Sequence, residues 1–132
     1  MNKNFKVYRS SAGSGKTYAL SLNYIVLALE GSGNSYINYY KRILAITFTN
    51  KAAAEMKERI LRYLFILSEK EDIDNILDYI LKETDLEKNE VYKRAKKVYH
   101  HILHNYSDLS VSTIDTFTSR IIRTFARDLG IS

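Results

Sequence analysis

The spacing of apolar positions near the N-terminus predicts a short strand followed by a helix. The stretch FKVYRS (5–10) alternates apolar and polar residues and runs into a Ser/Gly turn, a pattern typical of a strand that ends at a loop. From Lys16 to about Glu30, apolar residues recur at helical spacing. Gly31 comes just past this segment, where the left-handed backbone that closes a helix favours glycine.

A second strand and helix are expected directly afterwards. The stretch RILAITFT (42–49) is short, apolar and rich in β-branched residues, which favours a strand in a buried parallel sheet. Asn50 can cap the helix that follows. One face of that helix is apolar, and its members are Ala52, Ala53, Met56, Ile60, Leu64 and Leu67.

The remainder of the chain predicts two further helices, a third strand and a last helix. The helices are expected at about 72–83 and 87–104, and the strand at 109–114. The last helix has an apolar face made of Phe117, Ile121, Ile122 and Phe125, and Gly130 closes it. Strands that alternate with helices imply an α/β fold with a parallel sheet, and no linker divides residues 1–132 into separate domains.

Composition excludes several classes of protein. Hydrophobic residues make up 45% of the chain and charged residues 27%, as in an ordinary globular protein. The chain has no cysteine, so it has no disulfide, thiolate nucleophile or zinc finger. The N-terminus lacks the apolar core of a signal peptide, and no apolar run is long enough to cross a bilayer. We therefore expect a soluble cytoplasmic protein without membrane contact.

The net charge of +5 is unevenly distributed. The segment from Glu69 to Glu90 carries a net charge of −6, so the remainder carries +11. A basic body of this kind suits a polyanion such as nucleic acid. A solvated surface of mixed charge is the alternative interpretation.

The stretch SSAGSGKT predicts a phosphate-binding loop. It fits the pattern G-x-x-x-x-G-K-[ST], except that Ser10 replaces the first glycine. Glycines let successive amides point at phosphate oxygens, and the start of the following helix adds its dipole. Lys16 is expected to reach the β- and γ-phosphates of ATP, and the Thr17 hydroxyl to ligate Mg²⁺. The full set of expected nucleotide-binding residues is Ser10, Ser11, Ala12, Gly13, Ser14, Gly15, Lys16 and Thr17. A glycine-rich turn that binds nothing is the alternative.

The stretch ILAITFTNKAAAEMKERI (43–60) predicts a nucleic-acid contact. An aromatic side chain and hydroxyls at the C-terminal edge of a parallel sheet can stack on a base and bond phosphates; a core phenylalanine with ordinary capping residues is the alternative. The stretch also resembles motif Ia of UvrD/RecB-type superfamily 1 helicases, and SAGSGKT (11–17) resembles their motif I. The resemblance implies that Phe48 contacts a DNA base. It implies that Thr47, Thr49, Asn50 and Lys51 contact the DNA backbone or support the turn.

The stretch VSTIDTFTSRIIRTFARDLG (111–130) is similar to motif Ic of the same helicases, with Asp115 where many relatives have histidine. The resemblance implies DNA contacts from Thr113, Asp115 and Phe117. Arg120 begins an arginine stripe that can follow phosphates, although a solvated helix face is the alternative. Asp115 could instead be a Walker B aspartate that holds Mg²⁺.

Together these resemblances imply an incomplete RecA-like P-loop NTPase domain 1A with a helical insertion at about 69–104. We expect the N-terminal part of an ATP-dependent DNA helicase or helicase-nuclease of recombination and repair. Its partners would be single-stranded or duplex DNA and other helicase-nuclease subunits. No catalytic residue beyond Lys16 is assigned, because no Walker B acid or later arginine motif is identified, and we expect no ATP turnover from this stretch alone. A non-catalytic binding module and a small nucleotide kinase are the alternatives.

Two other features have competing interpretations. His100, His101 and His104 have a spacing that can bring two imidazoles together on a metal, or they lie on a helix surface. Tyr18 follows the phosphate loop directly, where it can lie against an adenine or pack in the core.

Overall fold

The computed structural model describes residues 14–32 and 35–130, with side chains described from Tyr18 onward. The predicted strand at 5–10 and residues 10–13 of the predicted phosphate loop lie outside the described residues. The elements in chain order are α1 (Ser14–Glu30), η1 (Tyr39–Arg42), β1 (Ala45–Thr47), α2 (Asn50–Ser68), α3 (Ile76–Glu83), α4 (Lys88–His104), η2 (Tyr106–Asp108), β2 (Val111–Thr113) and α5 (Ile114–Asp128).

The two strands form a parallel pair, which confirms the predicted α/β class. Ala45 is paired with Val111, and Thr47 with Thr113. Both strands are shorter than predicted. At β1 the chain before Ala45 forms the 3-10 turn η1, and after Thr47 it leaves the sheet to begin α2. P-loop fold details depend on segments outside the described residues.

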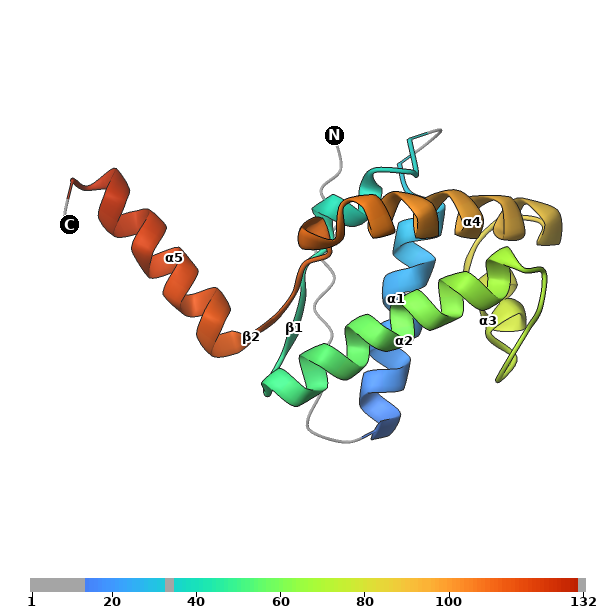
Figure 1. The fold of residues 1–132 in the computed structure, drawn as a ribbon, viewed down its shortest axis with the longest axis horizontal. Helices are drawn as coiled ribbons and strands as arrows, with labels where there is room; N and C mark the ends of the chain where they lie inside the picture. Colours follow the sequence, from blue (N-terminus) through green and yellow to red (C-terminus); the bar gives the residue numbers. More distant parts are fainter. Residues whose placement is uncertain (1–13, 33–34, 131–132) are drawn as a thin grey trace.

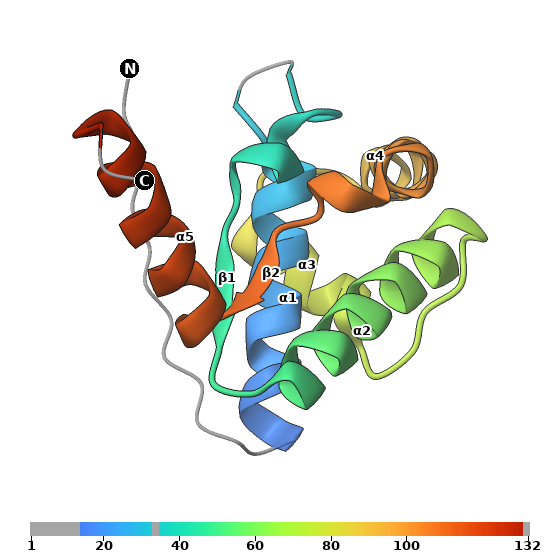
Figure 2. The same ribbon diagram turned by 60° about the vertical axis from the view of Figure 1, so that its left-hand side comes forward.

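The core lies where α1, α2 and α4 meet. In Figures 1 and 2, α1 runs behind the strands, and α2 and α4 lie on the same side of the molecule. Ile25 and Leu29 of α1 have no exposed surface, and neither do Met56 and Ile60 of α2. The predicted apolar face of α2 is confirmed apart from Ala52, which is only partly buried, and Tyr63 joins it.

Arg94 of α4 joins that helix to the end of α1. Its Nη1 donates hydrogen bonds to the carbonyl oxygens of Leu29 (2.9 Å) and Glu30 (3.2 Å), and its Nε lies 2.9 Å from a carboxylate oxygen of Glu90. The guanidinium also lies 4.3 Å from the centre of the Tyr36 ring. These contacts satisfy the last carbonyls of α1 with a cation, which also interacts favourably with the helix dipole.

Two helix starts differ from the expectation. Thr49, not Asn50, caps α2: its backbone is extended and its hydroxyl accepts a hydrogen bond from the Ala52 amide at 3.0 Å. The helix expected from residue 72 begins at Ile76, because Asp74 and Asn75 have positive φ angles of 56° and 57° and interrupt the helical backbone. The predicted ends at Glu83 and His104 are confirmed.

Helix α5 extends away from the rest of the described chain (Figure 1). None of its residues is buried, and the side chains of Ile121, Ile122 and Phe125 are 51%, 61% and 64% exposed. The predicted apolar face therefore exists as a pattern, but nothing in the described chain covers it. No linker separates this helix from the sheet, since β2 ends at Thr113 and α5 begins at Ile114.

Across the described residues, no helix combines the length and the apolar character needed to cross a membrane.

Candidate nucleic-acid interface

The C-terminal ends of the two strands lie side by side, and each leads into a helix. Because Thr47 and Thr113 are paired in register, the starts of α2 and α5 lie at the same sheet edge (Figure 2). Two helix N-termini at one edge present unpaired amides and the positive ends of two dipoles, which favour anions. The sequence-predicted DNA contacts lie at this edge or in the first two turns of the helices that leave it.

The turn after β1 is stabilised from within. Thr47 is only 3% exposed, and its hydroxyl donates to the carbonyl oxygens of Thr49 (3.1 Å) and Ser112 (3.4 Å). The expectation that the Thr47 side chain is exposed at the strand end is therefore wrong, because its hydroxyl satisfies backbone carbonyls of both strands. Phe48 is 57% exposed, and Asn50 and Lys51 are exposed.

The start of α5 is held by Thr113. Its side-chain oxygen accepts a hydrogen bond from the Thr116 amide at 3.2 Å, and the two hydroxyls lie 3.0 Å apart. Asp115 and Arg120 are exposed, while Phe117 is half-buried. Asp115 stands in the first turn of α5, where a carboxylate interacts favourably with the helix dipole.

A groove of about 680 Å³ opens between α2 and α5. Strand β2 forms its floor, and η2 reaches it with Tyr106. The lining residues are Asn50, Ala53, Ala54, Lys57, Glu58, Leu61, Tyr106, Val111, Ser112, Thr113, Thr116 and Arg120.

The groove unites only some of the predicted contacts. It brings together Asn50, Thr113 and Arg120, which come from separate elements of the chain. The other predicted positions lie on the same sheet edge or helix but do not line the groove; they are Thr47, Phe48, Thr49, Lys51, Asp115 and Phe117.

Lys57 and Tyr106 are groove residues that the sequence did not identify. The Lys57 ammonium lies 5.7 Å from the centre of the Tyr106 ring, within the range of a cation–π contact. Lys57 belongs to the motif Ia helix but not to its TFTNKAA segment, and Tyr106 lies in a connection before the third predicted strand. No local pattern marks either residue, because their proximity depends on how α2 packs against β2.

The predicted nucleotide-binding residues lie at the other end of the described chain. Helix α1 begins at Ser14, which confirms that the GSGKT segment leads into a helix. Tyr18, the first residue with a described side chain, packs edge-on against Tyr63 at a ring distance of 6.1 Å. Its hydroxyl donates to the carbonyl oxygen of Asp74 at 3.2 Å. This environment favours the packing interpretation of Tyr18 over contact with adenine.

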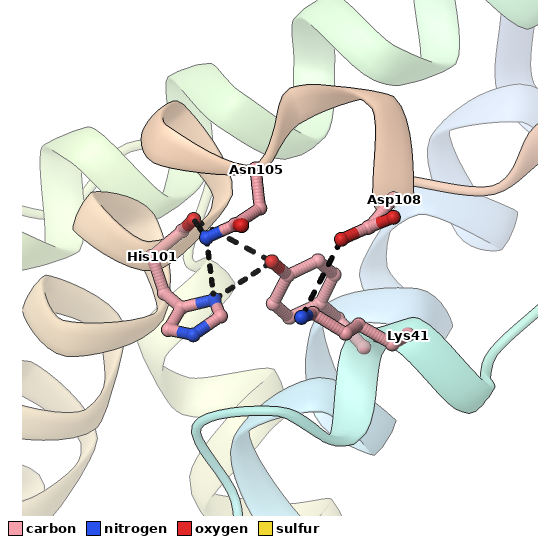
Figure 3. Close-up of polar contacts among 5 residues, drawn as sticks. Lys41, His101, Asn105 and Asp108 are labelled. Carbon is pink, nitrogen blue, oxygen red and sulfur yellow. Dashed lines mark hydrogen bonds and ion pairs between the residues drawn. The ribbon is translucent and has the colours of Figure 1, made fainter.

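The three histidines of α4 do not share a role. The Nδ1 of His101 lies 2.8 Å from the Tyr40 hydroxyl, whereas His100 and His104 are exposed (Figure 3). Asn105 donates to the His101 carbonyl oxygen at 2.9 Å, and Lys41 forms an ion pair with Asp108 at 3.4 Å. Within residues 14–32 and 35–130 we find no set of three potential ligands placed to hold a metal.

Comparison with known proteins identifies the family. The sequence model of the UvrD/REP helicase N-terminal domain matches residues 1–132. The chain therefore belongs to the UvrD/REP helicase family, of UvrD/RecB type.

Individual relatives agree with this assignment. An ATP-dependent helicase/nuclease from Streptococcus suis is 30% identical over 126 residues, which cover 93% of this chain and 8% of that protein. A RecBCD enzyme subunit RecB from Buchnera aphidicola is 32% identical over 129 residues, 89% of this chain and 10% of that protein. The ATP-dependent DNA helicase UvrD1 of Mycobacterium leprae is 51% identical over 55 residues, 40% of this chain and 6% of that protein. The chain thus spans a tenth or less of the length of these relatives, and no solved structure gives a significant match.

Proposed function

We propose that this chain is the N-terminal ATP- and DNA-binding part of an ATP-dependent DNA helicase or helicase-nuclease that acts in recombination and repair in the cytoplasm. The observation that carries the proposal is the shared sheet edge, where the motif Ia and motif Ic segments of a UvrD-type chain begin their helices side by side. Under the proposal, residues 1–132 form one incomplete RecA-like domain, with α3 and α4 as its helical insertion.

The chemistry of the edge suits a DNA strand. Phe48 presents an exposed ring that can stack on a base, and the neighbouring helix starts offer amides to phosphates. Asn50, Lys51 and Arg120 supply further donors. Thr47 and Thr49 support the turn that carries Phe48, which is the role left to a buried hydroxyl and a helix cap.

Nucleotide binding belongs to the loop before and within the first turn of α1. Under the proposal the backbone amides of residues 10–15 surround the phosphates of ATP, Lys16 contacts the β- and γ-phosphates, and Thr17 ligates Mg²⁺. Bound Mg²⁺ neutralises phosphate charge. Such a chain retains its ligands without turning ATP over by itself, and other helicase-nuclease subunits are its expected partners.

Two titrations test the proposal. Fluorescence anisotropy with a labelled single-stranded oligonucleotide should show binding that Phe48→Ala weakens by about tenfold, the range expected for the loss of one stacked base. The matched control is Phe65→Ala, which removes a phenylalanine on α2 that is 46% exposed, away from the sheet edge. Equal loss in both variants would contradict a specific role for Phe48.

The second titration follows a fluorescent ATP analogue with Mg²⁺. Lys16→Ala should abolish binding, whereas Lys96→Ala on α4 should leave it unchanged. Binding that is indifferent to Lys16 would refute the phosphate-loop assignment.

A further inference from the structure

The groove between α2 and α5 carries more than its two predicted helix starts. We propose that it takes a segment of single-stranded nucleic acid, with Tyr106 as a stacking platform for a base and Lys57 as a phosphate contact. This inference rests on the proposed function, and it extends the DNA path from the strand ends along α2 to the opposite end of β2.

The position of the two residues supports a path of useful length. The lining residues of α2 run from Asn50 to Leu61, a rise of about 16 Å along the helix. Tyr106 lies in η2, before the start of β2, while Thr113 ends that strand. A strand that contacts Thr113 and Tyr106 therefore follows β2 over its whole length rather than touching only the edge.

The charges of the groove favour an anion. Its lining carries Lys57 and Arg120 against the single carboxylate of Glu58. The ion pairs of the described chain join Lys41 to Asp108 and Arg94 to Glu90, so within that part of the chain neither groove cation is neutralised by an acid. Hydroxyls of Thr113 and Thr116 add hydrogen-bonding groups on the α5 side.

The aromatic contact favours an unpaired strand over a duplex. Tyr106 is 47% exposed, so one part of its ring remains accessible while Lys57 lies over it. Stacking on a side chain requires a base that is not already paired and stacked in a helix. A ring next to a cation matches a base next to its phosphate.

The absence of tryptophan from the chain gives a direct test. Tyr106→Trp places the only indole in the groove, and titration with an oligodeoxythymidylate of about 20 nucleotides should quench its emission as a base stacks on it. Phe65→Trp places the indole elsewhere on α2 and should report no quenching. A poly-glutamate titration of Tyr106→Trp distinguishes a nucleic-acid groove from a surface for acidic protein, and quenching by poly-glutamate alone would overturn the inference.

Affinity measurements provide a second readout. Tyr106→Leu should weaken binding of the same oligonucleotide by roughly tenfold, while Tyr106→Phe, which keeps the ring, should bind like the parent chain. Lys57→Gln should reduce the slope of log K against log salt by about 0.7, the value for one lost phosphate contact on a single strand. The matched control Lys96→Gln, an exposed lysine of α4, should leave the slope unchanged.

The outcomes separate this inference from the proposed function. If the oligonucleotide binds and Phe48→Ala weakens it, but neither the indole emission of Tyr106→Trp nor the affinity of Tyr106→Leu changes, the groove inference is wrong and the strand-end site stands. If no oligonucleotide binds at all, both fail.

Discussion

The hydroxyl of Tyr40 lies 2.8 Å from Nδ1 of His101, although the two residues are 61 positions apart in the sequence. Their rings also meet edge-on at 5.5 Å, and the Tyr40 side chain is fully buried. This pair connects η1, just before β1, to the C-terminal turns of α4, so it fixes where the predicted helical insertion ends relative to the sheet.

Removal of the Tyr40 hydroxyl tests how much this connection stabilises the fold. Tyr40→Phe keeps the ring and loses the hydrogen bond, so the free energy of unfolding in urea should fall by about 1 kcal/mol. His101→Leu should cost a similar amount, and the double variant should cost less than the sum of the two. Tyr39→Phe, at the half-buried neighbouring tyrosine, is the control and should change stability little. Additive losses would show that the two side chains are not coupled.

The buried tyrosines predict a loss of stability at alkaline pH. Burial raises the pKa of Tyr24, whose hydroxyl donates to the carbonyl oxygen of Tyr40 at 3.2 Å. The folded-state pKa is thus above the unfolded value of about 10, so this contribution is fully present below pH of about 10 and is lost as pH rises towards the folded-state value. Urea unfolding at a series of alkaline pH values should show a shallower decline for Tyr24→Phe than for the parent chain. Parallel curves would contradict the assignment.

Gly31 and Gly130 form a matched pair for testing backbone constraint. Both have positive φ angles, 63° and 72°, but a Cβ at Gly31 would lie 2.6 Å from Cα of Tyr36, whereas a Cβ at Gly130 would meet no atom within 4 Å. Gly31→Ala should therefore destabilise the chain by about 2–4 kcal/mol, from the left-handed backbone and the clash together. Gly130→Ala should cost about 1 kcal/mol. Thermal unfolding followed by circular dichroism measures both, and equal effects would rule out the clash.

The apolar face of α5 should contribute little to the stability of the described fold. Ile122→Glu and Phe125→Glu replace side chains that are 61% and 64% exposed, so each should change the free energy of unfolding by less than about 0.5 kcal/mol. Ile60→Ala, at a fully buried position, should cost about 2–5 kcal/mol.

The same two substitutions should reduce self-association of the chain. Exposed apolar faces promote association, and light scattering over a concentration series measures it. Association that persists unchanged in both glutamate variants would exclude this face as its cause.

Local pattern predicted the helices well because their periodicity and end signals act over a few residues. The apolar spacing of α2 identified Met56, Ile60, Leu64 and Leu67 as core residues, all of them fully buried. The glycine after α1 was placed correctly for the same reason, since Gly31 accepts a backbone angle that few other residues adopt. Thr49 and Asn50 are both good cap residues, so sequence alone could not choose between them.

Contacts between distant segments could not be predicted in this way. The amphipathic pattern of α5 identified an apolar face but carries no information on what lies against it. Lys57, Tyr106 and Arg120 reach one groove from three separate elements, and the alternation of residues within each element is silent about that proximity. The family motifs located the sheet edge, because motif residues cluster at strand ends, but the rest of the groove is formed by tertiary packing.

The direct junction between Thr113 and Ile114 gives α5 a mechanical role. A helix of this length reaches about 22 Å from its first residue, and no flexible residue separates it from the strand that precedes it. A force applied near Leu129 would therefore act as a torque on β2, and through the ladder between Thr113 and Thr47 it would reach the turn that carries Phe48. Whatever grips the far end of this helix can tilt the surface on which a base would rest.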